Sequence, residues 1–168
     1  ELRRPQERDI ELESIAEEIN SANIGRIRVT GLKAVPRSRV AELKNTVCEK
    51  TYRVEVSIDP RIPIESLKKG AQRLSSAVVE QRTPTRVSHR RADLVRPRLI
   101  NYMTVKSFVK GMMELEIRAQ HGTYIRELVS GDGGRTDPSL SLLVDSPCKV
   151  EVLDVLNLHL DNSEKKDG

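Results

Sequence analysis

Two short stretches of this 168-residue sequence carry side chains that could bind a ligand or act on it. Residues 50–52, Lys-Thr-Tyr, begin a segment of strictly alternating polarity. Residues 122–128 place Tyr124 and Arg126 in the first turn of an expected helix, where free backbone N–H groups also point. Each stretch has a structural alternative: a core tyrosine in the first, and an ordinary strand-to-helix corner in the second. Taken singly, neither motif specifies a function.

A third feature is the concentration of arginine in residues 82–98, the basic segment. The whole chain has 29 basic and 25 acidic residues, a net charge of +4, whereas this segment alone has six arginines and one acid, a net charge of +5. The six are Arg82, Arg86, Arg90, Arg91, Arg96 and Arg98. Clustered guanidiniums are typical of phosphate contacts, so the basic segment predicts a surface that binds a polyanion. The alternatives are a solvated charged face and a face that meets an acidic protein.

Composition excludes several classes of protein. Two cysteines, Cys48 and Cys148, are too few for a disulfide framework or a four-cysteine zinc site. The histidines His89, His121 and His159 lack metal-ligand spacing, so we expect no metal. Since no apolar run approaches the roughly 20 residues that span a bilayer and the charged N-terminus is no targeting signal, we expect a soluble cytoplasmic protein, or a nuclear one in a eukaryote.

The elements that must position the chemical residues are helices and strands in mixed order. An amphipathic helix is predicted after Asp9, closing near Gly25, followed by a strand around residues 26–30 and a helix from Pro36. Strict alternation predicts a strand over residues 50–58. A helix is predicted over 64–75, followed by two antiparallel strands over 99–109 and 112–119 that are joined at Lys110-Gly111. Next come a helix capped by Thr123, a loop over 130–136 and a short helix from Pro138 to Leu143. The last predictions are a strand over 149–160 and a disordered tail over 161–168. The result is one α+β domain over residues 1–160, with helices covering a face of a sheet.

In this order the motifs resemble the pseudouridine synthases. Within them they resemble the archaeal and eukaryotic tRNA pseudouridine synthases of the THUMP-linked type, which modify uridines of the TΨC arm. The matching stretches are residues 50–52, 81–91, 122–129, 131–132, 134–136, 138–139 and 153–155. Residues 122–128 alone also resemble the bacterial TruB enzymes, so they indicate the superfamily. The resemblance implies the pseudouridine synthase catalytic fold, with a mostly antiparallel mixed sheet and flanking helices, of which this chain is the C-terminal part.

The resemblance also assigns roles to residues. Isomerising uridine to pseudouridine breaks the glycosidic bond, rotates the base and rejoins it through carbon, with no cofactor and no metal. By resemblance, Tyr52 stacks on the base and has a possible proton-transfer role, while Tyr124 contacts the substrate or supports the pocket wall. Arg126 falls where the family keeps a basic residue against the catalytic aspartate, and Ile125 and Leu153 form an apolar floor. The residues expected to bind RNA are Arg82, Arg86, Arg90, Arg91, Arg96, Arg98 and Arg135.

The family's catalytic aspartate has no counterpart in this sequence. In the family it lies N-terminal to the Lys-Thr-Tyr strand, and residues 1–5 resemble the segment immediately after it. The accessory N-terminal domain with its paired cysteines has no counterpart either. Asp132 and Asp137 lie in or beside a glycine-rich loop, but the resemblance gives Asp132 a loop-structuring role, and we expect neither to be the nucleophile. Arg126 would then lack its usual partner, so we expect this chain to be inactive without an upstream segment or chain that carries the aspartate.

These observations lead to two main hypotheses from different classes. In the first, the chain is part of a tRNA pseudouridine synthase, an isomerase, and supplies the RNA-binding face and the base-holding residues. In the second, it is a non-catalytic RNA-binding subunit or module of a ribonucleoprotein. Both predict salt-sensitive RNA binding, whereas only the first predicts turnover once an aspartate segment is restored. A third hypothesis, a structural protein whose arginines meet an acidic partner, predicts no dependence of RNA binding on those arginines.

Overall fold

The computed structural model describes residues 11–160 of the chain. It divides into two compact units, residues 1–46 and 47–168, and every expected site residue belongs to the second unit. Residues 1–5, which resemble the segment after the family's catalytic aspartate, and the tail 161–168 lie outside the described residues. The assignment of residues 1–160 to one family domain stays a prediction. Within residues 11–160, no helix is long and apolar enough to cross a membrane.

The first unit contains the two predicted helices, α1 (Leu12–Ala22) and α2 (Arg37–Asn45). The strand predicted around residues 26–30 is wrong, because this segment pairs with no strand of the described residues. Instead the Val29 N–H donates to Asn20 Oδ1 at 2.7 Å, and Asn20 Nδ2 donates to the Val29 carbonyl oxygen at 2.9 Å. The side-chain amide of one α1 residue thus satisfies peptide groups that a partner strand would otherwise pair.

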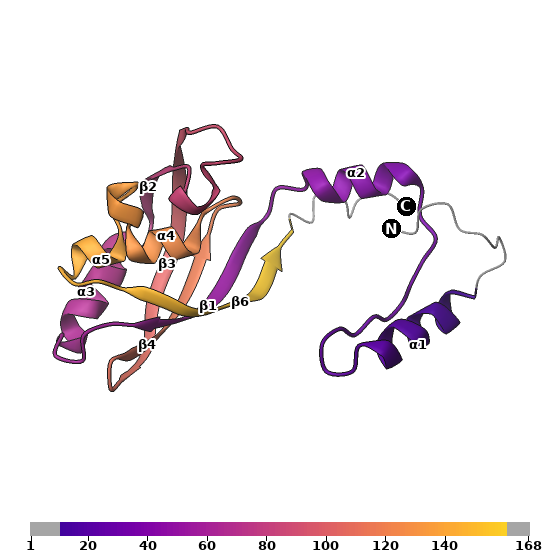
Figure 1. Cartoon of the computed structure of the whole chain (residues 1–168), viewed down its shortest axis with the longest axis horizontal. Coiled ribbons are helices and arrows are strands. Elements are labelled where there is room, and N and C mark those ends of the chain that lie inside the picture. Colours follow the sequence, from indigo (N-terminus) through magenta and orange to yellow (C-terminus); the bar gives the residue numbers. More distant parts are fainter. Residues whose placement is uncertain (1–10, 161–168) are drawn as a thin grey trace. The chain divides into compact units, whose positions relative to one another are not determined.

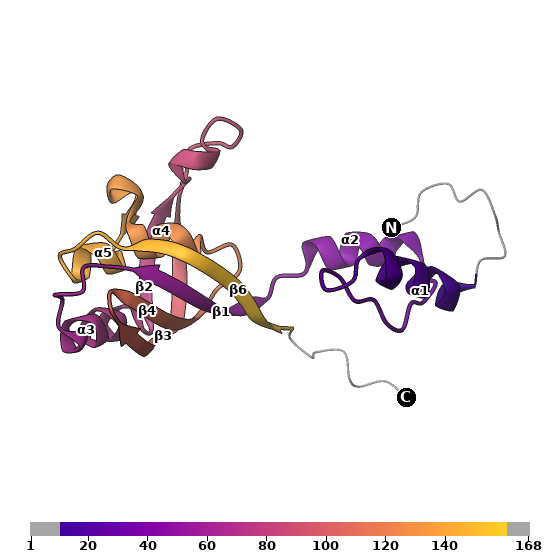
Figure 2. The ribbon, with the colours of Figure 1, turned by 60° about the horizontal axis from the view of Figure 1, so that its bottom comes forward.

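The second unit is built on a six-stranded sheet with the strand order β5-β2-β3-β4-β1-β6, in which all neighbouring strands are antiparallel (Figure 1). The strands are β1 (Glu49–Ser57), β2 (Ala77–Arg82), β3 (Val95–Val109), β4 (Met112–Ala119), β5 (Thr136–Asp137) and β6 (Lys149–His159). Strands β1 and β6 lie side by side along one edge of the sheet (Figure 2). The predicted α+β class is confirmed.

The β3–β4 hairpin forms where the sequence places it. Its turn residues Lys110 and Gly111 both have positive φ, 50° and 80°, as a two-residue hairpin turn requires. A Cβ on Gly111 would lie 2.8 Å from the Ile58 carbonyl oxygen, so no larger residue fits there without a backbone shift. This turn sets the register in which β3 and β4 begin to pair, with Val109 opposite Met112.

One face of the sheet carries the core, and three helices pack on it. Helix α3 (Ile64–Leu74), helix α4 (Ile125–Ser130) and helix α5 (Leu140–Leu143) bury their apolar side chains in one cluster with alternate residues of the strands. The other face is polar, with Arg53 paired to Glu114 at 3.0 Å and Arg118 paired to Glu49 at 2.7 Å. Such one-sided burial explains the strict alternation of residues 50–58.

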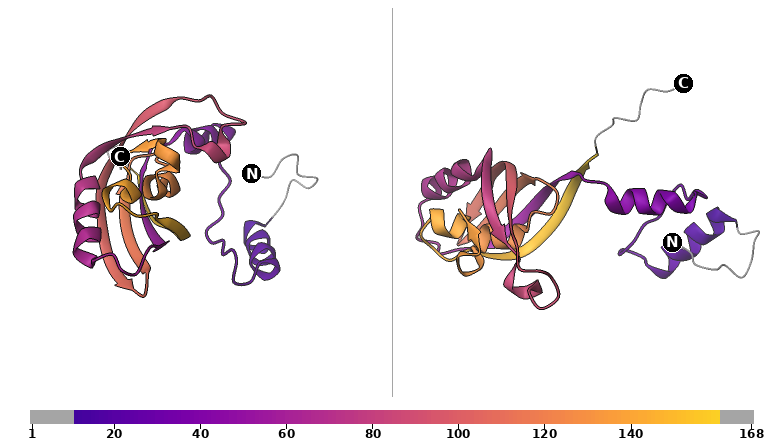
Figure 3. Two further views of the ribbon diagram at one scale, coloured as in Figure 1. Left: turned by 60° about the vertical axis from the view of Figure 1, so that its left-hand side comes forward. Right: turned by 90° about the horizontal axis from the view of Figure 1, so that it is seen from above.

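The basic segment forms the loop end of the β2–β3 hairpin. Strand β2 was not predicted, and β3 begins at Val95, four residues earlier than expected. The two strands carry between them a loop, residues 83–94, that includes a 3₁₀ turn at Thr85–Val87. This loop, the basic loop, projects from the body of the second unit (Figures 2 and 3).

Candidate active site

Side chains from separate segments of the second unit line one cavity of about 270 Å³, the tyrosine cavity. Its lining residues are Tyr52, Arg86, Thr123, Tyr124, Ile125, Arg126 and Leu153. All five residues given a catalytic or substrate-binding role in the sequence analysis are among them, together with Arg86 of the basic loop. They come from β1, β6, the start of α4 and the basic loop, which lie far apart in the chain. The tyrosine cavity is therefore the candidate active site.

Tyr52 and Leu153 form the wall that the sheet contributes. Tyr52 lies on β1 between Ile117 of β4 and Val155 of β6, and Leu153 lies on the edge strand β6 opposite Val54. The Tyr52 ring is half-buried, and this burial raises the pKa of its phenol above the usual value. The phenol is therefore protonated at neutral pH and presents a neutral aromatic ring to the cavity.

Gln81 of β2 holds the backbone of Tyr124, and the sequence analysis gave it no role. The Tyr124 N–H donates to Gln81 Oε1 at 2.9 Å, and Gln81 Nε2 donates to the Tyr124 carbonyl oxygen at 3.0 Å. Gln81 is only 1% exposed, so this side chain is a buried polar group with both ends satisfied. Because Gln81 is polar, the local sequence pattern did not predict that it is buried in a strand.

The predicted cap of α4 by Thr123 is wrong. The Thr123 hydroxyl donates to the Gln120 carbonyl oxygen at 2.8 Å, which closes the preceding turn, and Tyr124 occupies the cap position without a side-chain bond. Gln81 instead satisfies the Tyr124 N–H. Helix α4 ends at Gly131, whose φ is +83° and where a Cβ would lie 2.8 Å from Ser139 Oγ. Helix α4 is thus one short segment with mostly buried side chains, next to the cavity.

The basic loop reaches the tyrosine cavity through Tyr124. Arg91 Nη1 donates to the Tyr124 hydroxyl at 3.0 Å, and the guanidinium carbon of Arg86 lies 5.9 Å from the centre of the Tyr124 ring. Arg86 in turn donates through Nε to Glu127 Oε1 at 2.7 Å, and this hydrogen bond raises the pKa of Arg86 further. Cavity and basic loop are therefore one connected structure.

Arg126 lines the cavity and is held by the backbone of β6. Its Nη1 donates to the Val150 carbonyl oxygen at 2.9 Å. Among residues 11–160, no carboxylate lies within ion-pair distance of its guanidinium. The remaining N–H donors of this side chain are available to an acidic group that enters the cavity.

The other expected RNA-binding arginines differ in what they contact. Arg82 and Arg135 both pair with Asp93, and the hydrogen bond from Arg82 lowers the pKa of that carboxyl group. Arg96 donates to Thr83 Oγ1 at 3.3 Å. Among residues 11–160, the Arg98 side chain donates only to the neighbouring Pro97 carbonyl oxygen, at 3.0 Å. Within the same described range, the Arg90 side chain makes no hydrogen bond and no ion pair, and it is exposed.

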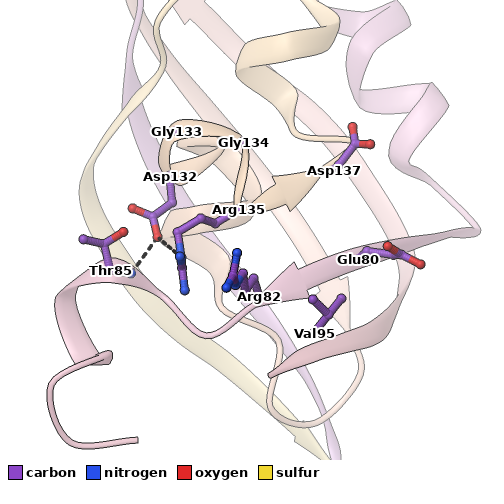
Figure 4. Close-up of a pocket in the computed structure, with 9 residues that line it drawn as sticks. All are labelled: Glu80, Arg82, Thr85, Val95, Asp132, Gly133, Gly134, Arg135 and Asp137. Carbon is purple, nitrogen blue, oxygen red and sulfur yellow. Dashed lines mark hydrogen bonds and ion pairs between the residues drawn. The ribbon is translucent and has the colours of Figure 1, made fainter. Parts of the chain in front are cut away.

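The aspartates near the glycine-rich loop are not among the residues that line the tyrosine cavity. Figure 4 shows them in a different pocket. Asp132 accepts the Thr85 N–H at 2.8 Å and lies 3.9 Å from Arg135, so it ties the basic loop to the loop after α4. Asp137 points away from this pair, on β5 opposite Glu80. Both aspartates line a second cavity of about 560 Å³, the glycine-loop cavity, together with Glu80, Arg82 and Arg135.

The sequence of this chain matches those of known proteins. The family model described as "Pus10, C-terminal" matches residues 1–159. The tRNA pseudouridine synthase Pus10 of Methanothrix thermoacetophila is 41% identical, over 94% of this chain and 35% of the relative. That of Methanocaldococcus jannaschii is 40% identical, over 99% of this chain and 36% of the relative. The chain thus spans about a third of the length of these relatives.

A solved structure shares the fold. The crystal structure of a Cbf5-Nop10-Gar1 complex matches with a TM-score of 0.55 and 18% identity, over 66% of this chain and 30% of that chain. The resemblance to pseudouridine synthases found in the sequence is confirmed by these matches. The chain belongs to the Pus10 C-terminal family.

Proposed function

We propose that this chain is the substrate-holding part of a tRNA pseudouridine synthase, and that the tyrosine cavity receives the uridine base. The observation that carries the proposal is the meeting of Tyr52, Arg126 and Leu153 in one cavity beside the basic loop. The relatives that match the chain are named tRNA pseudouridine synthases. The resemblance in sequence points to uridines of the TΨC arm as the substrate.

The lining of the cavity suits a base that must detach, turn and reattach. The reaction breaks the bond from the sugar to the base nitrogen and forms one from the same sugar carbon to a base carbon. That base carbon loses a proton and the nitrogen gains one, so atoms balance without a co-reactant. An aromatic face such as Tyr52 stacks on any orientation of the base, and Ile125 and Leu153 exclude water without fixing it. Arg126 would hold a catalytic carboxylate ionised, and that carboxylate comes from outside residues 11–160.

The basic loop would bind the tRNA backbone. Arg82 and Arg135 are paired with Asp93, so we assign them to holding the loop rather than to first contact with phosphate. The outer arginines, Arg90, Arg91, Arg96 and Arg98, have no carboxylate partner among the described residues and are the proposed phosphate contacts. Since such contacts release counterions, affinity should fall steeply as salt rises.

One observation favours a second candidate function, a non-catalytic RNA-binding module. No acidic residue lines the tyrosine cavity within residues 11–160. A module of this kind would bind tRNA through the same loop and cavity but would never turn over. The two candidates differ only in what happens when a carboxylate-bearing segment is supplied.

The deciding experiment measures pseudouridine in an unmodified tRNA transcript by nucleotide analysis after incubation with the purified chain. We expect tRNA binding without product from this chain alone, and product once the chain is joined to the preceding segment of a curated relative. Product from the chain alone would contradict the assignment of the carboxylate to another segment, and would direct attention to Asp132, Asp137 and Asp154. Binding without product in both cases would favour the module.

A further inference from the structure

Glu127 is a buried carboxylate that the assigned chemistry does not use. It lies on α4 with its side chain 8% exposed, next to the core residues Leu128 and Val129. Moving a carboxylate out of water costs several kcal/mol unless it is well paired, and an apolar side chain of similar size would often be as stable there. A buried acid at this position is therefore better explained by what it holds than by stability alone.

The group that Glu127 holds is Arg86 of the basic loop. Arg86 Nε lies 2.7 Å from Glu127 Oε1, and Arg86 Nη2 lies 3.4 Å from Oε2. This two-point contact fixes the plane of the guanidinium as well as its position. The residue before it is fixed too, since the Thr85 N–H donates to Asp132 at 2.8 Å. Both the backbone turn and the side chain of Arg86 are thus held by acids of the α4 region.

The Arg86 guanidinium contacts Glu127 through one edge and remains half-exposed at the tyrosine cavity. Its side chain is 53% exposed, and it both lines the cavity and lies near the Tyr124 ring. Its remaining N–H donors can bind an anion, in contrast to Arg126, which the proposed function reserves for a carboxylate. A nucleotide whose base enters the cavity carries its own phosphate at the rim, at the place where such a donor lies.

We propose that Glu127 positions Arg86 to bind the phosphate of the nucleotide whose base enters the tyrosine cavity. This inference rests on the proposed function and deepens it, because it assigns the rim of the cavity to the target nucleotide's own backbone. Glu127 is a positioning residue that acts through Arg86 and does not touch the RNA. Arg86 differs in this from the outer arginines, which would meet phosphates elsewhere on the tRNA.

The test removes the charge of single phosphates and asks whether the loss depends on Glu127. Unmodified tRNA is prepared with a neutral methylphosphonate linkage 5′ of each TΨC-loop uridine in turn, and its affinity for the chain is measured. For one linkage we expect about a tenfold loss with the wild-type chain, because hydrogen bonds to charged groups are among the strong ones. With Glu127→Met we expect about tenfold weaker binding of unaltered tRNA, and less than a twofold further loss at that linkage.

Two further variants make the outcome decisive. Arg86→Met combined with Glu127→Met removes both charges of the pair and so leaves no buried charge without a partner. This double variant should bind tRNA as weakly as Glu127→Met and should show the same small further loss at that linkage. It therefore provides the test if Glu127→Met folds poorly. Asp59→Asn is the matched control, since it breaks the ion pair of Asp59 with Arg61 away from the cavity, and it should respond to the linkages as the wild type does. Equal losses in wild type and double variant at every linkage would overturn the inference. No tRNA binding by the wild type would instead overturn the proposed function.

Discussion

Two cavities of the second unit adjoin the basic loop, and they differ in chemistry more than in size. The glycine-loop cavity is the larger, about 560 Å³ against about 270 Å³. Its lining includes three carboxylates, Glu80, Asp132 and Asp137, whereas the lining that residues 11–160 give the tyrosine cavity includes none. Glu80 and Asp137 lie opposite each other across β2 and β5, which concentrates negative charge.

Under the proposed function the smaller cavity receives the anionic substrate, so volume alone would select the wrong site. Carboxylates repel the phosphates of an RNA, and the arginines of the larger cavity are already paired with Asp93. The tyrosine cavity instead offers two aromatic rings, an apolar floor and guanidinium donors. Its chemistry suits a nucleotide, while the larger cavity acts as the place where the basic loop is anchored.

The largest effect is expected when the outer arginines are reversed in charge. Arg90→Glu with Arg91→Glu removes two of the proposed phosphate contacts and adds two repulsions, so tRNA affinity should fall about a hundredfold. The slope of log affinity against log salt should become shallower in the same titration. An unchanged affinity and slope would favour a structural protein whose arginines meet an acidic partner.

Arg126→Ala should lower turnover at least tenfold once the chain is joined to a carboxylate-bearing segment. The reason is the loss of a charged hydrogen-bond partner in the cavity, about 2 kcal/mol or more. Single-turnover rates across a range of pH would detect it. A variant with the wild-type rate and the wild-type pH profile would remove Arg126 from the site.

Gln81→Met should destabilise the second unit by about 1–2 kcal/mol, because it leaves the Tyr124 N–H without its partner. The Tyr124 carbonyl oxygen keeps the Leu128 N–H at 2.9 Å. Urea unfolding measures this change. Gln72→Met is a suitable control, since Gln72 is an exposed residue of α3. If Gln81→Met is as stable as the control, Gln81 does not position Tyr124.

Substitutions of Tyr52 separate stacking from proton transfer. Tyr52→Ala should weaken binding or turnover about tenfold, because stacking of a base on an aromatic ring contributes about 1–3 kcal/mol. Tyr52→Phe keeps the aromatic ring and removes only the hydroxyl, so it should lose only the contribution of the phenol to proton transfer. Equal, near-wild-type rates for the two variants in the joined enzyme would place the base elsewhere.

The smallest effect is expected in the glycine-loop cavity. Glu80→Gln with Asp137→Asn removes two exposed carboxylates that face each other, so tRNA affinity should stay within about twofold of wild type or rise slightly. The same salt titration measures it. A large loss of affinity would mean that this cavity takes part in binding and that the contrast between the two cavities is drawn wrongly.

Local sequence pattern predicted the elements whose residues face one side of a sheet or helix, such as residues 50–58 and the hairpin at Lys110-Gly111. It missed β2, where the buried position is filled by the polar Gln81, because that burial depends on contacts with Tyr124 far along the chain. The family resemblance gave roles to five residues that line the tyrosine cavity, and those roles stay predictions. It did not place Thr123 or Arg86 there. The ion pair of Arg86 with Glu127 joins residues 41 positions apart, so no spacing rule reveals it.

The most direct test of the tyrosine cavity as the base-binding site is photocrosslinking. Unmodified tRNA carrying 4-thiouridine at single TΨC-loop positions is bound to the chain and irradiated, and the crosslinked peptides are identified by mass spectrometry. We predict crosslinks to the peptides that contain Tyr52, residues 123–126 and Leu153. Crosslinks confined to residues 131–137 would contradict this assignment and place the base in the glycine-loop cavity.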